Sequence, residues 1–367
     1  MIGPPLQRPE DERSWATSGL PTVDRGHCQG GPRFGPDCAG PTSSDFAGGH
    51  AGSRLELDRQ ALYRFVQRRC YCRIMAPRTR AVSAFTTRGH AVHTSLADVL
   101  EEPLQDGLTS IKTNNRWFDF VYEDRGADTT LVTFHAGMPQ RAERYPIFSS
   151  RAIAEAIHAN YLGFADPACG ALESLPTFWH LGTKRVAAGR FIPAIINHVL
   201  ATGTGKHLLF FGSSAGGFAA LNYSAQFPES AVLVMNPRID LLSEPNRFPG
   251  YAVTCFPGVD PKTLARQLPV SMSEAYAQSS GNTIAYLQNT EDDDYYWHHF
   301  VPFMAALGGK SDVYVHAEAW GAGHVVPPRD AYVEPMARLV REAPHWDRAL
   351  ASGFELFRPD AGQPTAL

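Results

Sequence analysis

The stretch HLLFFGSSAGGFAAL, residues 207–221, constrains the fold more than any other part of the sequence. Its first half, 207–212, is an apolar run typical of a buried strand. Its second half leads into a helical pattern, 218–228, that ends at Pro228. Only small residues separate the two. The chain must therefore turn sharply from a strand into a helix, and it brings two hydroxyl groups to that turn.

Short apolar runs alternate with helical patterns from about residue 110 onwards. Strands are expected at 117–123, 130–137, 161–167, 207–212, 231–237, 282–289 and 312–319. Helices are expected at 152–161, 190–203, 218–228 and 329–342. The first strand, WFDFVYE, alternates with a period of two, as a half-buried antiparallel strand does. The whole pattern predicts an α/β fold with a mostly parallel sheet and helices on both of its faces.

Two segments depart from this pattern. Residues 238–281 are rich in Pro, Asn and Ser and are long for a connection, so we expect a cap insertion over the sheet edge, within a domain that spans 110–350. Residues 1–54 hold few large apolar groups and cannot offset the entropy lost on ordering. We therefore interpret residues 1–75 as a disordered or non-native N-terminal extension, with Met75 as the hypothetical true start.

Composition limits the partners of the chain. The net charge is −4 over 367 residues, which gives no reason to expect a nucleic-acid partner. No apolar run approaches the roughly 20 residues of a membrane span, and the N-terminus lacks the features of a secretory signal. We therefore expect a cytoplasmic protein without a membrane span, whose six cysteines are reduced. The sequence leaves the oligomeric state open.

The sharp turn carries a G-x-S-x-G pattern, GSSAG, at residues 212–216. Glycines two positions before and after a nucleophile leave room for a strand-to-helix turn, and the helix N-terminus favours negative charge near the hydroxyl. We predict Ser214 as the nucleophile, because its rival Ser213 lacks the glycine two positions earlier. The stretch resembles the nucleophile elbow of the α/β-hydrolase superfamily. By order of elements, the resemblance covers roughly residues 115–345.

The resemblance implies a triad of serine, acid and histidine in that chain order, with an oxyanion hole built from loops. His324, in WGAGHVVPP, follows the last predicted strand and is the predicted base. The acid is expected in the stretch YLQNTEDDD, where Asp292 stands three residues after the turn-forming Asn289. Asp293 is a close second, and Asp240, which follows an earlier strand, is a third candidate.

Two backbone N–H groups are expected to form the oxyanion hole. One belongs to Ala215, the residue after the predicted nucleophile. The other is expected in the loop HAGMP that follows the strand at 130–137, where Gly137 is preferred and Ala136 is next. This loop resembles the HG-type oxyanion loops of the superfamily but has Ala136 where a glycine is usual.

A metal site is a competing interpretation of the acidic stretch. Asp292, Asp294, His298 and His299 have suitable residue types, but no metal-binding signature joins them. The phosphate-binding pattern G-x-x-x-x-G-K-[ST] is also missing from the sequence. We therefore predict neither a metal nor a cofactor.

The expected function is that of a serine hydrolase of the carboxylesterase type, which cleaves an acyl ester through an acyl-enzyme. An acyltransferase that moves the acyl group to a sugar or another alcohol is one alternative, and a non-catalytic binding protein with a hydrolase fold is another. The stretch YLQNTEDDDYYWHH faintly resembles hydrolase-fold proteins of glycan modification and accessory secretion. The expected partner is thus a small-molecule ester or an acylated glycan.

Overall fold

The computed structural model describes residues 78–138, 144–169, 179–277, 281–307 and 312–358. These residues belong to one of the two units into which the chain divides, Tyr71–Leu367. The N-terminal extension predicted for residues 1–75 lies outside the described residues.

The described residues form a ten-stranded mixed sheet in the order β12-β11-β10-β9-β8-β5-β7-β4-β3-β2. Its strands are β2 (His90–His93), β3 (Gly107–Thr113), β4 (Arg116–Glu123), β5 (Thr129–Phe134), β7 (Asn160–Phe164), β8 (His207–Ser213), β9 (Ala231–Met235), β10 (Thr283–Asn289), β11 (Asp312–Glu318) and β12 (Glu355–Leu356). The strands from β11 to β7 in this order run parallel. β4 lies antiparallel to both β7 and β3, and β12 lies antiparallel to β11. A separate pair joins β1 (Thr79–Arg80) to β6 (Arg144–Tyr145).

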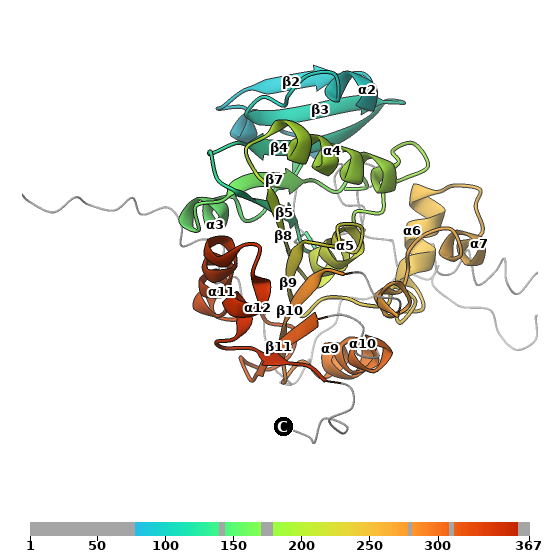
Figure 1. Ribbon diagram of the computed structural model, residues 1–367. Coiled ribbons are helices and arrows are strands. Elements are labelled where there is room, and N and C mark those ends of the chain that lie inside the picture. Colours follow the sequence, from blue (N-terminus) through green and yellow to red (C-terminus); the bar gives the residue numbers. More distant parts are fainter. Residues whose placement is uncertain (1–77, 139–143, 170–178, 278–280, 308–311, 359–367) are drawn as a thin grey trace, which may run out of the picture. The chain divides into compact units, whose positions relative to one another are not determined.

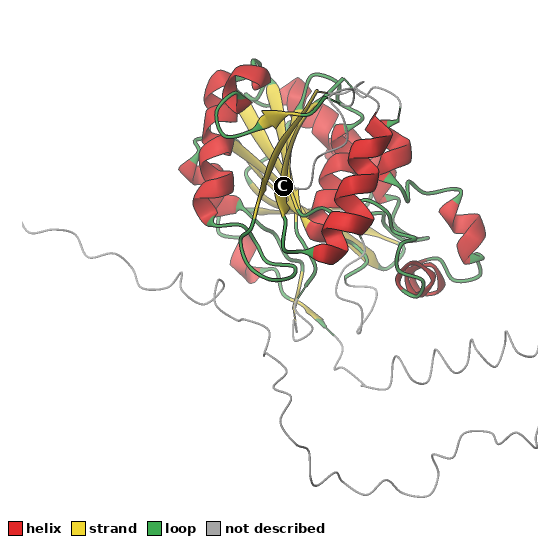
Figure 2. Cartoon of the chain, turned by 90° about the horizontal axis from the view of Figure 1, so that it is seen from below, coloured by secondary structure: helices red, strands yellow, loops and turns green. Residues whose placement is uncertain are grey.

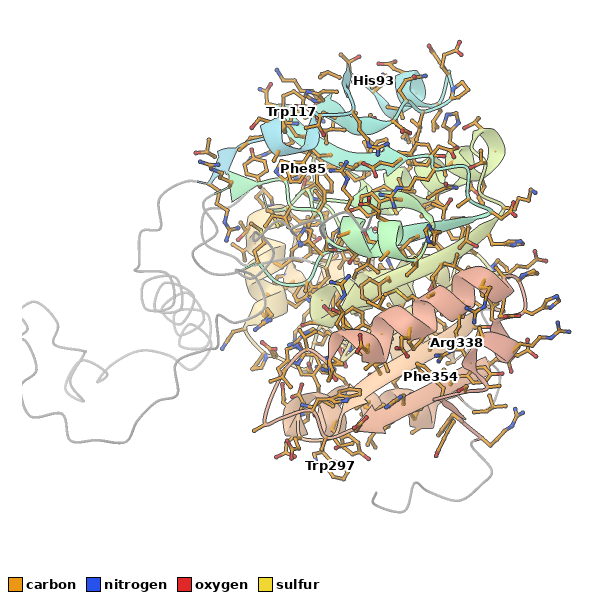
Figure 3. All side chains as sticks on the ribbon, turned by 90° about the vertical axis from the view of Figure 1, so that its left-hand side faces the viewer. Phe85, His93, Trp117, Trp297, Arg338 and Phe354 are labelled. Carbon is orange, nitrogen blue, oxygen red and sulfur yellow. The ribbon has the colours of Figure 1, made fainter. Side chains whose placement is uncertain are left out.

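Helices cover both faces of the sheet (Figures 1 and 2). On one face lie α4 (Ala188–Thr202), α5 (Ser214–Ser224), α6 (Arg247–Cys255), α8 (Met272–Tyr276) and α10 (Val301–Leu307), which share a hydrophobic core with the sheet. On the other face, α3 (Arg151–Ala156), α11 (Arg329–Glu342) and α12 (Trp346–Leu350) cover a second core. Figure 3 looks onto this second face, where Arg338 of α11 and Phe354 lie. The predicted α/β fold with a mostly parallel, doubly covered sheet is thus confirmed.

The burial of α4 and α5 follows from their sequences. α4 places Ile192, Ile195, Ile196 and Val199 at helical spacing against the sheet and ends before Gly203. α5 is buried along almost its whole length, and its glycines and alanines give it no polar face. A helix that is apolar all round belongs in the interior of a domain. The element that begins at the predicted nucleophile is therefore held in the core.

β4 differs from the prediction of a half-buried strand, because both of its faces are covered. Phe118 packs in the first core, as its alternation predicts. The polar positions on the other face are buried too: Asp119 pairs with Arg80 at 2.5 Å, and Glu123 pairs with Arg125 at 2.5 Å. Buried carboxylates need such partners. The period-two pattern thus marks ion pairs inside the protein and not a solvent-facing edge, although the antiparallel pairing is as predicted.

The sheet reaches beyond the predicted range 110–350 at both ends, since it includes β2, β3 and β12. Between β9 and β10, the described part of the segment 238–281 forms α6, α7 (Pro261–Ala265) and α8. α8 contacts α5 and α10, so this insertion packs on the same face of the sheet as the helix that begins at Ser214. Its action as a cap over the sheet edge stays a prediction.

Every helix among the described residues is too short or too polar to cross a membrane. Cys169 and Cys255 are buried, free thiols. Burial raises the pKa of the Cys255 thiol well above its usual value.

Among the described residues, three histidines are buried, His135, His180 and His299, and burial lowers the pKa of each. The exposed fractions of His180 and His299 are 0% and 1%. Burial lowers the pKa of His180 to about 4. Burial, helped by the positive charge of Arg238, lowers the pKa of His299 to about 3. Both side chains therefore resist protonation in the folded protein at a pH where an unfolded chain takes up protons.

Stability is expected to fall as the pH is lowered from about 6.5 toward 4. Between pH 6.5 and 4, these histidines bind protons in the unfolded chain but stay neutral in the folded protein. Above pH 6.5, they are neutral in both states, so folding no longer depends on their protonation. The free energy of unfolding should drop by up to about 1.4 kcal/mol per pH unit for each histidine. Urea denaturation at a series of pH values measures this slope.

His299→Gln isolates the contribution of one buried histidine to this pH dependence. The variant should show a shallower decline of the free energy of unfolding between pH 6.5 and 4. His345→Gln changes an exposed histidine and should keep the parent slope. A His299→Gln slope equal to that of the parent would show that burial of this histidine does not couple to pH.

Candidate functional site

The site begins at the turn from β8 into α5, where Ser214 is the first helical residue. Its φ of 51° lies in the left-handed region, which costs free energy for any residue other than glycine. The turn is tight. A Cβ at Gly212 would collide with the carbonyl oxygen of Gly216, and a Cβ at Gly216 would collide with the carbonyl oxygen of Phe134. Both glycines of the G-x-S-x-G pattern are therefore required by space.

The end of β5 lies against this turn, because Gly216 approaches Phe134, the last residue of β5, so closely. The loop that contains Gly137 starts at this point, and Gly137 is exposed. Ala215 is buried in the first turn of α5, where helix geometry provides no carbonyl partner for the N–H groups. The structure thus brings both segments that were expected to supply oxyanion donors to the neighbourhood of Ser214.

A buried histidine anchors the loop after β5. The N–H of Asp166 donates to Nε2 of His135 over 3.1 Å, so the proton of the neutral ring lies on Nδ1. Nδ1 then donates to the carbonyl oxygen of Ala136 over 2.8 Å. Burial lowers the pKa of His135, which favours this neutral form. His135 therefore holds the loop just before Gly137 in one conformation.

Asp292 and His324 form a close pair. Oδ2 of Asp292 accepts a hydrogen bond from Nδ1 of His324 over 2.5 Å, with the carboxylate buried and the imidazole 39% exposed at its side chain. The remaining two candidate acids have different surroundings: Asp293 is exposed, and Oδ1 of Asp240 accepts from the N–H of Leu242 over 2.7 Å. Of the three candidate acids, the structure places Asp292 behind the imidazole.

Asn289, at the end of β10, holds the loop that carries His324. Its Nδ2 donates to the carbonyl oxygens of Gly321 and Gly323 over 2.7 and 2.8 Å. Its Oδ1 accepts from the N–H of Trp320 over 3.0 Å. Gly321 and Gly323 have φ values of 132° and 79°, so the bend requires glycine at these positions. Asn289 is thus more than the turn-forming residue that the sequence suggested.

Asn236 is a second anchor, which the sequence analysis missed. It follows β9 with a φ of 38°, a backbone conformation that Asn tolerates better than most residues. Its Nδ2 donates to the carbonyl oxygen of Val325 over 2.9 Å, and its Oδ1 accepts from the N–H of Asn289 over 2.7 Å. The only sequence signal for it is a polar residue directly after an apolar strand.

Tyr295 is also a residue that the sequence analysis missed, and it lies between the predicted nucleophile and the predicted base. Its Oη is 3.1 Å from Oγ of Ser214. Its ring stacks on the imidazole of His324 at a centroid distance of 3.8 Å. No hydrogen bond joins Ser214 directly to His324 in the described part of the chain. The serine hydroxyl is therefore held by the tyrosine, beside the histidine.

Metal ligands do not gather here. Within the described ranges, no group of three or more His, Cys, Asp and Glu side chains could hold a metal ion. Asp294 and His298 pair at 3.0 Å on the surface, whereas Nδ1 of the buried His299 accepts backbone N–H groups, including that of Ile239 over 3.4 Å. His298 thus pairs with an exposed carboxylate, and His299 accepts from the backbone, so the two side chains do not face a common site.

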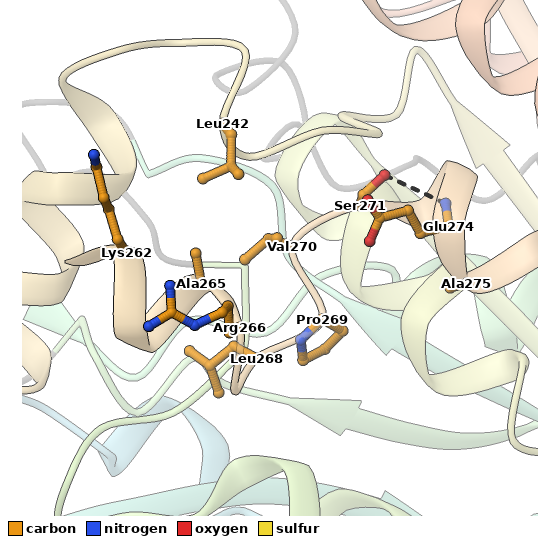
Figure 4. Close-up of a pocket in the computed structure, with 10 residues that line it drawn as sticks. All are labelled: Leu242, Lys262, Ala265, Arg266, Leu268, Pro269, Val270, Ser271, Glu274 and Ala275. Carbon is orange, nitrogen blue, oxygen red and sulfur yellow. Dashed lines mark hydrogen bonds between the residues drawn. The ribbon is translucent and has the colours of Figure 1, made fainter. Parts of the chain in front are cut away.

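A separate depression of about 700 Å³ lies in the insertion between β9 and β10 (Figure 4). Its lining includes Leu242, Arg266, Val270 and Glu274, and it includes neither Ser214 nor the Asp292–His324 pair. It is open to solvent and distinct from the site described above.

Ser214, Asn236, Asp292 and His324 each follow the carboxyl end of one strand, β8, β9, β10 and β11 respectively. These four strands are neighbours and parallel, so the four residues meet at one edge of the sheet. Ligands of open α/β sheets bind outside the carboxyl ends of the strands.

Comparisons with known proteins agree with this arrangement at the level of the fold. No family model and no curated protein matches the chain. Among solved structures, the capsule O-acetyltransferase of Neisseria meningitidis serogroup A aligns with a TM-score of 0.51 and 15% identity, over 67% of this chain and 100% of that one. The fold is that of the α/β-hydrolases.

Further solved structures of this α/β-hydrolase fold align less well. The S-formylglutathione hydrolase from Agrobacterium tumefaciens has a TM-score of 0.43 and 12% identity, over 59% of this chain and 88% of its own. The esterase Pf2001 from Pyrococcus furiosus has a TM-score of 0.40 and 13% identity, over 73% of this chain and 95% of its own. The fold that the resemblance of the elbow implied is confirmed, and the alignment with the capsule O-acetyltransferase carries this conclusion.

The crowding of this hydrolase-fold elbow can be tested by adding one methyl group. Gly212→Ala should lower the free energy of unfolding by about 1–3 kcal/mol or more, because its Cβ meets backbone atoms that cannot move aside easily. Thermal and urea denaturation measure the effect.

Gly189→Ala provides the matched control. Gly189 lies in α4, and a Cβ there meets no atom within 4 Å. The variant should be as stable as the parent or slightly more stable, since alanine is the better helix former. Equal stability of the Gly212→Ala and Gly189→Ala variants would contradict the close packing of the elbow.

Proposed function

We propose that the chain is a serine hydrolase of the carboxylesterase type, which cleaves an acyl ester through an acyl-enzyme. The observation that carries this proposal is the Asp292–His324 pair, which lies at the same sheet edge as the strained turn that carries Ser214. A buried carboxylate that fixes one nitrogen of an imidazole leaves the other nitrogen free to act as a base. The expected substrate is a small-molecule ester or an acylated glycan.

Ser214 is the proposed nucleophile. Its Oγ–H points to Nε2 of His324, which takes the proton while Oγ attacks the carbonyl carbon of the ester. Asp292 keeps the proton of the resting imidazole on Nδ1 and stabilises the imidazolium that forms. The imidazolium then gives its proton to the leaving alcohol. Water attacks the acyl-enzyme in the same way and returns the serine.

The N–H groups of Ala215 and Gly137 are the proposed oxyanion donors. Negative charge develops on the carbonyl oxygen when Oγ bonds to the carbon, and N–H groups aimed at that oxygen stabilise it. The N-terminus of α5 adds a positive partial charge at the same place. Loss of one such donor typically slows an enzyme by roughly 10²- to 10³-fold.

Acyl transfer to a sugar or another alcohol is the second candidate. The alignment with a capsule O-acetyltransferase favours it, as a likeness of fold. The two reactions share the acyl-enzyme and differ only in the acceptor that attacks it. Hydrolysis and acyl transfer both require a reactive Ser214, whereas the third candidate, a non-catalytic binding protein, does not.

A fluorophosphonate probe should label the wild-type chain, because it reacts with serines that a neighbouring base activates. Ser214→Ala should abolish the labelling. Ser213→Ala, the same change one residue earlier, should leave it intact. Mass spectrometry of the labelled peptide gives the site. A wild-type chain that takes no probe would favour the non-catalytic binding protein.

With labelling established, hydrolysis of p-nitrophenyl acetate with and without sugar acceptors separates hydrolysis from transfer.

The identity of the acid can be tested by removing one charge at a time. Asp292→Asn should lower kcat/KM for p-nitrophenyl acetate by roughly 10³- to 10⁴-fold, because the imidazole loses the partner that sets its tautomer. Asp293→Asn changes the neighbouring, exposed carboxylate and should stay within a few-fold of the parent. A larger loss in Asp293→Asn than in Asp292→Asn would reassign the acid.

A further inference from the structure

Tyr295 contacts every member of the proposed triad. Its Oη lies 3.1 Å from Oγ of Ser214, and its ring stacks on His324 with an interplanar angle of 24°. Its backbone N–H donates to Oδ1 of Asp292 over 3.3 Å. The exposed fraction of Tyr295 is only 6%, so this placement is fixed by packing.

The surroundings of Tyr295 hold both its ring and its hydroxyl. The ring of His299 meets it edge to face at a centroid distance of 4.9 Å. Nη2 of Arg238 donates to Oη over 2.9 Å. The residue stands directly before a single π-helical turn, Tyr296–Phe300, an irregularity that is frequent at functional sites. A phenylalanine would fill the same space, so packing alone does not explain the hydroxyl.

The direction of the hydrogen bond from Arg238 leaves the hydroxyl proton of Tyr295 free to be donated to Ser214. Arginine has donors only, so Oη of Tyr295 accepts from Arg238 and its own proton is available for Oγ of Ser214. On the other side, a neutral His324 that donates from Nδ1 to Asp292 has an acceptor at Nε2. The donors can therefore run in one direction, from Arg238 through Tyr295 to Ser214, and the serine's own proton is left to pass to Nε2 of His324 in the reaction.

We propose that Tyr295 is a further catalytic residue, whose hydroxyl donates a hydrogen bond to Oγ of Ser214. This inference rests on the proposed function and adds a residue to it. When the Oγ proton passes to Nε2 of His324, negative charge develops on Oγ before the bond to the acyl carbon is complete. A hydrogen bond to a charged oxygen is stronger than one to a neutral hydroxyl, so Tyr295 stabilises this charge.

The same bond assists the second half of the cycle. In the breakdown of the second tetrahedral intermediate, the bond between the acyl carbon and Oγ breaks and its electron pair returns to Oγ. The imidazolium of His324 then gives Oγ its proton. Tyr295 donates to Oγ while it carries this charge and keeps its own proton throughout.

Arg238 is a positioning residue that acts through Tyr295. Its side chain is 4% exposed and pairs with Glu244 at 2.5 Å, so its charge is matched inside the protein. Its backbone N–H donates to the carbonyl oxygen of Ser214 over 3.0 Å, which ties it to the elbow. The guanidinium therefore orients the tyrosine hydroxyl and keeps its proton directed toward the serine.

Tyr295→Phe is the direct test, since it removes the hydroxyl and keeps the ring that contacts His299 and His324. The rate of fluorophosphonate labelling at Ser214 and the kcat for p-nitrophenyl acetate should fall by about 10- to 100-fold, with little change in KM. Tyr296→Phe makes the same chemical change one residue later and should leave both rates unchanged. Thermal denaturation checks that the two variants are equally folded.

A double-mutant cycle separates this role from a structural one. Arg238→Gln should slow labelling in the wild-type background but have little further effect in Tyr295→Phe, because the arginine acts through the lost hydroxyl. Independent, additive losses would overturn the positioning role of Arg238. If the Phe variant does not fold, the loss in Arg238→Gln alone still tests the chain of donors.

The outcomes distinguish this inference from the proposed function. Labelling of Ser214 in the wild-type chain with an unchanged rate in Tyr295→Phe would overturn the role of Tyr295 alone and leave the hydrolase intact. A wild-type chain that is not labelled at Ser214 would overturn both. A slow Tyr295→Phe variant with normal Tyr296→Phe and normal stability would support both.

Discussion

The turn between β8 and α5 is the constraint on which the rest of the site depends. It holds Ser214 in a left-handed conformation and leaves no room for a side chain at Gly212 or Gly216. Such strain persists only where the surroundings determine the backbone. Here α5 is buried along most of its length and β8 is a central strand, so the core on both sides holds the turn in place. A surface loop could not keep a serine in this position.

The remaining groups of the site are fixed by polar contacts and not by burial alone. The loop that carries His324 is tied to the ends of two strands, through Asn289 on β10 and through Asn236 after β9. His135 does the same for the loop after β5. Each anchor satisfies backbone groups that would otherwise lie unpaired near the sheet edge, which costs free energy when they are buried. The protein thus fixes its functional loops to a rigid frame.

Buried polar networks also mark where simple hydrophobic patterns mislead. The alternation in β4 predicts one solvent-facing side, yet Asp119 and Glu123 are buried in ion pairs with arginines. Arg80, the partner of Asp119, lies far away in the sequence, and Arg125, the partner of Glu123, follows the end of the strand. A local pattern shows that a residue is polar, but it does not show whether a partner of opposite charge covers it.

The sequence by itself determined the α/β fold class, most strands and helices, and the demand for small residues around Ser214. These depend on local periodicity and on the space near one turn, both of which neighbouring residues decide. Only the tertiary structure decided which acid stands behind His324, because Asp292 and Asp293 differ by one position and by the direction in which α9 (Asp293–Tyr295) begins. It also decided the place of Tyr295, since a contact between residues 81 positions apart depends on how two strand ends meet.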